Sequence, residues 1–345
     1  MAAFETTANR VSGENPATPY PYDIAINRNG TAIVAAYMNE TATTYGTIVR
    51  WVSDTVASLG QPSGSRMAVG AVSCDGMTIA GNSTEHAVGD GVVSGAPMRW
   101  TSTRGFETLA RLPASSESQG GTYTVDSMTP DGATFNGTYS APGEAARVVR
   151  WSSDAAQILF SLPDANSTLT AWSGDGTTLL GYDGASQAFL RTMTGPVQYL
   201  GVADVDSTRA LSYDGTVATG FFPTQTASAD DVGGFVWSSG QGVANLPLRS
   251  VAMSVTSDRV VHGYVAGTPD GVDLGEFIWD PTHGARDLRT ILAGYGVTIP
   301  DSVHIIAPAA VSADHRVFVA VCMDDADVEY PPQLCRGIVP ANAFD

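Results

Sequence analysis

One short phrase recurs seven times along the chain: a small or hydroxyl residue, any residue, Asp-Gly or a substitute, an alternating run of strand-forming residues, then Gly or Ala. The residue that marks each turn stands at positions 29, 75, 131, 175, 214, 258 and 314. These positions are 39 to 56 residues apart, and a repeat of that length is typical of one four-stranded propeller blade. The repeat therefore favours a series of small antiparallel sheets over any other architecture.

The phrase also places the strands within each repeat. Asp-Gly between two alternating apolar runs is a strong hairpin signal, because Gly accepts a positive φ and Asp tolerates it. A third strand ends in Trp in five repeats, at Trp51, Trp100, Trp151, Trp237 and Trp279. A fourth strand ends in Leu, as in residues 57–59 and 106–109. Four strands in each of seven repeats predict an all-β fold, a seven-bladed β-propeller formed by residues 1–345 as a single domain.

A propeller has to close its ring, and the last repeat lacks a fourth strand after residues 335–340. The sequence Phe-Glu-Thr-Thr-Ala at residues 4–8 is similar to Phe-Glu-Thr-Leu-Ala at residues 106–110, the fourth strand of the second repeat. We therefore expect residues 4–8 to complete the last blade, with residues 1–20 serving as closing strand and linker.

The charge balance excludes some functions. The sequence has 17 basic residues, all Arg, against 35 Asp and Glu, and its net charge is -18. An acidic surface repels nucleic acids and anionic membranes, so nucleic-acid binding is not expected. No stretch approaches ~18 consecutive apolar residues, and the first residues do not form a basic and then apolar signal segment. We expect neither membrane insertion nor a signal peptide in the chain as given.

Three cysteines are too few for a disulfide-stapled scaffold, so the core has to supply the stability. Cys322 and Cys335 flank an acidic loop and could face each other across two antiparallel strands, which allows one disulfide. Two buried thiols are the alternative.

The cadence Ala-x-x-x-Ser-x-Asp-Gly-x-x-x-x-Gly, followed by Arg-Trp and Leu-Gly, extends over residues 20–340. The chain ends in a pattern that runs from residues 287–292 through 310–314 to 339–340. These motifs resemble the HAF-repeat family of bacterial extracellular proteins. The resemblance implies a propeller-like repeat fold in a secreted or surface setting and names no reaction. The chain departs from the family pattern in showing no export signal.

Topology indicates where a binding site would lie. With four antiparallel strands in every blade, all Asp-Gly turns fall on one face of the disc, the turn face, and the long, dissimilar connections fall on the other, the loop face. Loops on a rigid scaffold usually carry function. Six aromatic residues mark the entry to the long loops: Tyr37, Tyr139, Tyr182, Phe221, Phe222 and Tyr264. They are candidates for stacking on sugars or anchoring a protein partner, and the alternative is that they cover the ends of the blades.

The repeated tryptophans are expected to fill the space between blades, since they recur at one strand position. Arginines alternate with them, at Arg50, Arg99, Arg150, Arg191 and Arg336. These side chains should point to the other face of each sheet, where we expect ion pairs with turn carboxylates.

Enzyme signatures are scarce. The sequence contains no nucleophile elbow, no phosphate-binding Gly-rich loop and no Cys and His cluster with zinc spacing, so we assign no catalytic residue. The acidic residues Asp324, Asp325, Asp327 and Glu329 are a weak candidate for binding Ca²⁺, although they lack the Gly turn of a known calcium loop. A solvated acidic loop is the alternative, and no other cofactor is expected.

The sequence leaves three functions open. The first is a non-enzymatic binding or structural propeller outside the cell, either a virion decoration or receptor-binding protein or a bacterial surface protein, which recognises a glycan or a protein. The second is a glycan-active hydrolase or lyase with a carboxylate on the loop face, because abundant carboxylates allow an acid and base pair. The third is an intracellular interaction scaffold.

Overall fold

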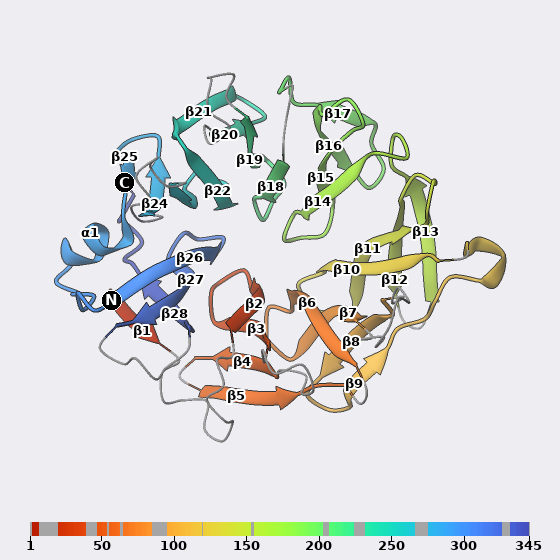
Figure 1. Cartoon of the computed structure of the whole chain (residues 1–345), viewed down its shortest axis with the longest axis horizontal. Helices are drawn as coiled ribbons and strands as arrows, with labels where there is room; N and C mark the ends of the chain where they lie inside the picture. The colour runs from red at the N-terminus through yellow and green to blue at the C-terminus, as the bar shows by residue number, and fades with distance from the viewer. Residues whose placement is uncertain are drawn as a thin grey trace.

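The computed structural model describes twelve stretches of the chain: residues 2–6, 20–38, 47–53, 55–62, 65–84, 95–118, 120–152, 155–202, 207–223, 232–265, 275–325 and 332–344. Within these stretches the chain forms seven four-stranded antiparallel sheets arranged as blades around a centre (Figure 1). The seven-bladed propeller expected from the repeat is confirmed. No helix among the described residues is long and apolar enough to span a membrane.

Each blade is a meander of consecutive strands, with the first strand at the centre of the ring and the fourth at its rim (Figure 1). Blade 1 contains β2 (Tyr20–Ile26), β3 (Ala32–Met38), β4 (Ile48–Val52) and β5 (Thr55–Gly60). Blade 2 contains β6 (Arg66–Val72), β7 (Thr78–Thr84), β8 (Pro97–Thr101) and β9 (Gly105–Thr108). Blade 3, which follows the short 3-10 helix η1 (Ala114–Ser116), contains β10 (Thr122–Met128), β11 (Thr134–Ser140), β12 (Arg147–Ser152) and β13 (Ala155–Ser161).

The remaining blades repeat this order. Blade 4 contains β14 (Thr168–Trp172), β15 (Thr178–Tyr182), β16 (Ala188–Thr192) and β17 (Val197–Tyr199). Blade 5 contains β18 (Ser207–Leu211), β19 (Val217–Pro223), β20 (Val232–Ser238) and β21 (Gly242–Leu248). Blade 6 contains β22 (Ser250–Val255), β23 (Val261–Val265), β24 (Gly275–Asp280) and β25 (Gly284–Arg286). After helix α1 (Leu288–Ala293), blade 7 contains β26 (Val303–Val311), β27 (Val317–Asp324) and β28 (Gln333–Ile338).

The N-terminal strand completes blade 7. Strand β1 (Ala3–Thr6) pairs antiparallel with β28, with Glu5 opposite Arg336, and lies beside it in Figure 1. Oε2 of Glu5 accepts hydrogen bonds from Nε of Arg336 at 2.8 Å and from Nη2 at 2.5 Å. The closure expected from the likeness between residues 4–8 and 106–110 therefore occurs over residues 3–6.

The Asp-Gly phrase works as a self-contained turn between the first two strands of a blade. In blade 2 the Ser73 hydroxyl donates to Oδ1 of Asp75 at 2.6 Å, and the same oxygen accepts from the Met77 amide at 2.9 Å. Gly76 takes a positive φ of 69°, and a Cβ at this position would lie 2.8 Å from the Cβ of Ala32 in blade 1. Glycine thus serves both the turn and the close approach of the preceding blade.

The repeated tryptophans pack each blade against the one before it, as expected. Trp151 is 1% exposed, clusters with Ala80 and Leu109 of blade 2, and donates its indole N–H to the Ala110 carbonyl at 2.8 Å. Trp51 lies in the same way against Val317 and other apolar residues of blade 7. These contacts place the apolar core between the blades and hold the ring together without a central core.

The expected ion pairs between the repeated arginines and turn carboxylates are mostly not found in the described residues, because several of these arginines bind other partners. Arg99 pairs with Glu107 on the rim strand β9 at 2.9 Å, as Arg336 does with Glu5. In the described part of the chain, Nε of Arg150 donates to Oδ1 of Asn136, and the Arg191 guanidinium lies 3.6 Å from the centroid of the Phe160 ring. Arg99, Arg150 and Arg336 thus bind residues on an adjacent strand of the same sheet, whereas Arg191 lies against β13 of the preceding blade. Arg50 alone among the five helps to lower the pKa of a turn carboxyl, that of Asp75, which is lowered chiefly by the Ser73 hydrogen bond.

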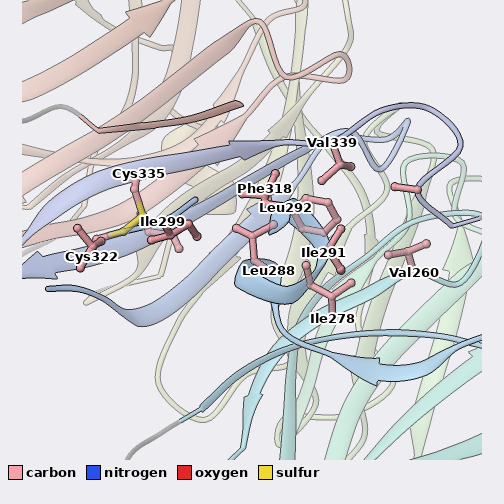
Figure 2. Packing of buried hydrophobic residues seen from close by; sticks show 13 residues of the cluster. Val260, Ile278, Leu288, Ile291, Leu292, Ile299, Phe318, Cys322, Cys335 and Val339 are labelled. Carbon is pink, nitrogen blue, oxygen red and sulfur yellow. A yellow bond between two sulfur atoms is a disulfide. The ribbon is translucent and has the colours of Figure 1, made fainter. Parts of the chain in front are cut away.

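The last blade carries an additional apolar cluster built around α1. Leu288, Ile291 and Leu292 of the helix pack against Phe318 of β27 and Ile278 of blade 6 (Figure 2). At the edge of this cluster Cys322 and Cys335 form a disulfide between β27 and β28, with Cα atoms 6.0 Å apart. The disulfide, one of the two states left open by the sequence, covalently joins two strands of the blade that closes the ring.

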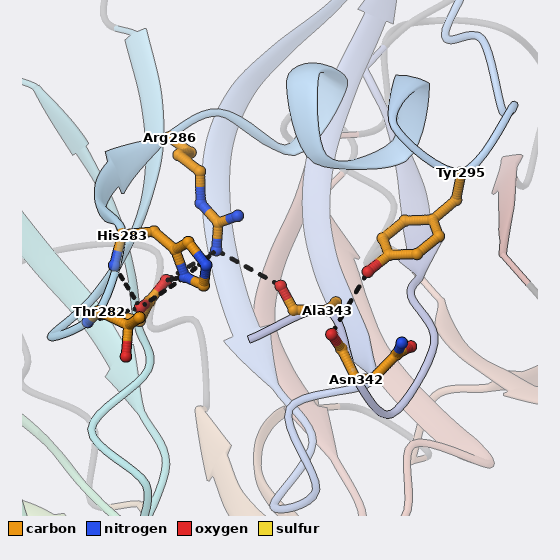
Figure 3. A network of polar contacts seen from close by, with 7 residues as sticks. Thr282, His283, Arg286, Tyr295, Asn342 and Ala343 are labelled. Atoms are coloured by element: carbon orange, nitrogen blue, oxygen red, sulfur yellow. Dashed lines mark hydrogen bonds and ion pairs between the residues drawn. The ribbon is translucent and has the colours of Figure 1, made fainter. Parts of the chain in front are cut away.

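Polar contacts fix the end of the chain to the same region (Figure 3). Nη2 of Arg286 donates to Asp280 Oδ2 at 2.7 Å and to the Ala343 carbonyl at 3.5 Å, while the Tyr295 hydroxyl donates to the Asn342 carbonyl at 3.4 Å. The residues after β28 are therefore held against blade 6 and the segment after α1, and Ala2, near the other chain end, packs against the same apolar cluster as Ala343.

Candidate functional site

Three of the six candidate aromatics are buried, which corrects their assignment as an exposed ring. Tyr37 is 7% exposed, Tyr139 is 1% exposed and Phe221 is 8% exposed. These residues lie on the second strand of a blade, and both faces of that strand are covered by the adjacent blades. Their rings therefore point into the spaces between blades. A buried ring cannot stack on a ligand, so these three residues belong to the core.

Tyr139 also has a structural task at the loop face. Its hydroxyl donates to the Ser118 carbonyl at 2.8 Å and accepts from the Ser118 amide at 2.6 Å. The Ser118 hydroxyl in turn donates to Glu144 at 2.5 Å, and Arg147 binds both Glu144 and the Ser116 carbonyl. This network fixes the connection between blades 2 and 3 on the loop face.

The other three aromatics have different outcomes. Tyr182 at the end of β15 and Tyr264 in β23 are half-buried, so part of each ring remains accessible. Phe222 lies in β19, but its side chain is outside what the structure describes. Tyr182 and Tyr264 are therefore the members of the original set that remain candidates for partner contact.

The calcium candidate falls partly outside the described residues. Asp324 ends β27 and Asp325 follows it, whereas Asp327 and Glu329 belong to the stretch 326–331 that the structure does not describe. Oδ2 of Asp325 pairs with Nε2 of His304 at 2.9 Å. The described stretches contain no group of three or more His, Cys, Asp or Glu residues that could hold a metal ion.

The turn-face end of the central channel is narrowed by side chains from opposite blades. The Arg28 guanidinium of blade 1 lies 4.7 Å from the centroid of the Tyr213 ring of blade 5. Blades 1 and 5 are not neighbours in a ring of seven, so this contact spans the channel. Burial raises the pKa of the Tyr213 phenol, and Cys74 of blade 2 adds to the rise. A cavity of about 240 Å³ at this end is lined by residues of all seven blades.

Bulges in the first strands shape the wall of the channel. In β10 the pairing with β11 shifts between Val125 and Ser127, so Asp126 is the additional residue, and it is exposed to the channel. The Thr124 hydroxyl donates to Oδ2 of Asp126 at 2.6 Å. Burial raises the pKa of Asp126 to about 6, against the opposing effects of the Thr124 hydroxyl and the Trp172 side chain. The carboxyl is surrounded by protein yet open to the water of the channel, which accounts for both its exposure and its raised pKa.

Asp126 lies at the inner end of a cleft between blades 3 and 4. The cleft has a volume of about 330 Å³ and extends from Ser140 and Thr168, at the loop-face ends of β11 and β14, inward to Asp126 and Trp172. Asp126 and Trp172 also line the channel cavity, so the two hollows meet at this pair. Most of the residues that line the cleft carry a hydroxyl group: Thr124, Thr138, Ser140, Ser167, Thr168 and Thr170.

Sequence reasoning did not single out this cleft, although one signal was present. Five of the six tryptophans occupy the repeated third-strand position, and Trp172 is the exception. It stands immediately before Ser173, the first residue of the turn phrase in its repeat. The equivalent position in the other repeats holds an aliphatic residue or Met, as at Val72 and Met128. In blade 4 no tryptophan occupies the repeated third-strand position. The Trp172 ring packs between blades 3 and 4 with Val148, Leu179 and Phe189, so its place outside the repeat marks an altered contact between these two blades.

No protein-family model matches the chain, and no curated protein matches its sequence. Among solved structures, the β-propeller domain of the Trilobed protease from Pyrococcus furiosus is similar over 92% of this chain and 94% of that one, with a TM-score of 0.59 and 10% identity. Oligogalacturonate lyase in complex with manganese matches over 100% and 98%, with a TM-score of 0.61 and 11% identity. The Cps50 (Swd1) β-propeller domain from Myceliophteria thermophila matches over 98% and 100%, with a TM-score of 0.52 and 13% identity. At these identities the likeness shows the propeller fold alone, which a lyase and other proteins share.

Proposed function

We propose that the protein is a non-enzymatic binding propeller that recognises a glycan on a cell or virion surface through its loop face. The observation that carries this proposal is the cleft between blades 3 and 4, which extends inward from the loop-face ends of β11 and β14 and is lined mainly by Ser and Thr residues. Hydroxyl and carboxyl side chains on a rigid wall match the alternating donors and acceptors of a sugar.

The turn face is a weaker candidate for recognition. The contact between Arg28 and Tyr213 spans the channel there. The Ser73 and Asp75 hydrogen bonds show that the turn residues are engaged in holding the turns themselves. The loop face therefore has the accessible, chemically varied surface that a ligand requires.

A setting outside the cell is supported by two features. The disulfide between Cys322 and Cys335 is of a kind that persists in oxidising surroundings. The net charge of -18 keeps the protein soluble and away from anionic membranes and nucleic acids. Both features fit a bacterial surface or virion protein and disfavour an intracellular scaffold.

The proposal is tested by labelled protein on an array of neutral and acidic glycans and on intact bacterial cells. We expect saturable binding that free saccharide competes, with the ligand recovered unchanged after prolonged incubation. Thr168→Arg at the cleft mouth should abolish the binding. Its matched control is Thr177→Arg, which introduces the same side chain into the exposed turn at the opposite end of the hairpin in blade 4 and should leave binding intact. Binding blocked by Thr177→Arg and not by Thr168→Arg would refute recognition through the loop face.

A glycan-active enzyme is the second candidate, and the raised pKa of Asp126 favours it. A carboxyl with a pKa of about 6 retains a proton often enough near neutral pH to act as a general acid. Release of reducing ends or unsaturated products from a bound polysaccharide, abolished in Asp126→Asn, would establish this activity in place of simple binding.

A further inference from the structure

The cleft between blades 3 and 4 contains a buried hydrogen-bond donor whose acceptor in the neighbouring blade is poorly placed. Trp172 is 8% exposed, and its indole Nε1–H has no hydrogen-bond partner of good geometry. Its one acceptor within reach among the described residues is the Asp126 carboxyl, whose pKa this weak contact acts to lower. By contrast, Trp151, which is also buried, donates its indole N–H to the Ala110 carbonyl. A buried donor without a well-placed acceptor costs free energy, so its retention indicates a partner that binds there.

The neighbouring hydroxyl groups hold the carboxylate in place. Thr124 donates to Oδ2 of Asp126, and the Thr124 and Thr138 hydroxyls are 2.9 Å apart. The Thr170 hydroxyl is occupied by Thr208 and by the Leu180 carbonyl. Because Thr124 occupies Oδ2, a ligand would be received at Oδ1, on a carboxylate that is already oriented.

The lining also indicates the charge of the ligand. Among the described residues that line the cleft, Asp126 is the one ionisable residue, and none is Arg or His. A phosphate, sulfate or carboxylate ligand would be repelled by the aspartate and would find no cation to bind. A volume of about 330 Å³ lies at the small end of ligand sites, which typically measure about 300–1,000 Å³. These features fit a neutral, hydroxyl-rich ring.

We propose that the cleft binds one neutral sugar residue, with one of its hydroxyl groups accepting a hydrogen bond from the Trp172 indole N–H and donating one to Oδ1 of Asp126. A hydroxyl group can accept and donate at once, so it satisfies both protein groups. This site deepens the proposed function, on which it rests, by naming the ligand class and the two residues that select it.

The experiment uses the full chain labelled with 5-fluorotryptophan, titrated with glucose, galactose and mannose and, as an anionic probe, galacturonate. The ¹⁹F resonance of Trp172, assigned by its absence in Trp172→Phe, should shift with a neutral sugar and should shift less with galacturonate. Trp172→Phe keeps an aromatic ring but lacks the N–H, so we expect affinity for the neutral sugar to fall about fivefold to tenfold, the equivalent of one hydrogen bond. Asp126→Asn should weaken binding by a similar factor.

Trp151→Phe is the matched control, because it deletes an indole N–H in the adjacent blade that already has a partner. It should leave sugar affinity unchanged within about twofold. If wild-type protein binds glycans but the Trp172 resonance does not shift and Trp172→Phe binds normally, the cleft assignment is wrong while surface recognition survives. If free sugars shift Trp172 but the protein binds no cell or glycan array, the site stands and the proposed function fails.

Discussion

Glu5 is the residue that fastens the closing strand, and its replacement tests how the ring is held. It accepts two hydrogen bonds from Arg336, a side chain that is 6% exposed. Hydrogen bonds to charged groups contribute about 1.5–3 kcal/mol when sheltered. Because Glu5 itself is 26% exposed, we take the lower end of that range for the pair of bonds. Glu5→Ala should then lower the free energy of unfolding by about 2 kcal/mol.

The matched control is Glu107→Ala in blade 2, where Glu107 binds Arg99 in the same Phe-Glu-Thr context. Strand β9 is joined to β8 by the short turn at residues 102–104 and stays in place when the ion pair is lost. Strand β1 has no such tether to β28. We therefore expect a smaller loss of stability from Glu107→Ala and no release of its strand.

Thermal unfolding and hydrogen exchange measure the two effects. A loss of about 2 kcal/mol should lower the Tm by about 3 °C in a protein of this length. Amides of β28 should also lose protection in Glu5→Ala, whereas blade 2 should be unchanged in Glu107→Ala. Equal, small shifts of Tm with full protection of β28 would show that β1 does not hold the ring closed.

Three further predictions concern a turn, a titratable group and the loop face. Gly76→Ala should lower the free energy of unfolding by more than the ~1 kcal/mol expected for a positive φ alone, since the added Cβ meets the preceding blade. Gly105 also has a positive φ but has open space around it, so Gly105→Ala should cost only about 1 kcal/mol. Denaturant unfolding measures both losses. Folding raises the pKa of Asp126 to about 6, so the contribution of this group to stability is full below about pH 4 and is lost as the pH rises through 6. Above pH 6, Asp126→Asn should therefore be more stable than wild type by about 1 kcal/mol after allowance for channel water. The melting temperatures of the two proteins should converge near pH 4. Replacing Tyr182 and Tyr264 together by Ala should reduce binding to the natural surface by about tenfold at unchanged Tm if these accessible rings contact the partner, and equal binding in a pull-down would remove them from the site.

The fold could be predicted because the repeat encodes it locally. Each Ser-x-Asp-Gly copy specifies a hairpin through its own hydrogen bonds, as at Ser73 and Asp75, and the spacing of the copies specifies a blade. The likeness of residues 4–8 to residues 106–110 identified the closing strand because both strands present a glutamate to an arginine on the neighbouring strand.

The candidate site could not be predicted in the same way, because it forms between blades. Asp126 and Trp172 come from different repeats, and their proximity depends on a bulge in β10 that the local sequence does not announce. The burial of three of the six aromatics at the loop entrances could not be predicted for a related reason. Whether a residue such as Tyr139 faces solvent or the next blade depends on the packing of blades, which strand alternation alone does not determine.

In the proposed function, the cleft between blades 3 and 4 binds a neutral sugar and leaves it chemically unchanged. Its most direct test is isothermal titration of the best array ligand into wild-type protein and Trp172→Phe, with the ligand analysed afterwards by chromatography. We expect one binding site, an affinity about fivefold to tenfold lower in Trp172→Phe, and ligand recovered intact. Identical titrations for the two proteins, or cleaved ligand after the wild-type titration, would contradict it.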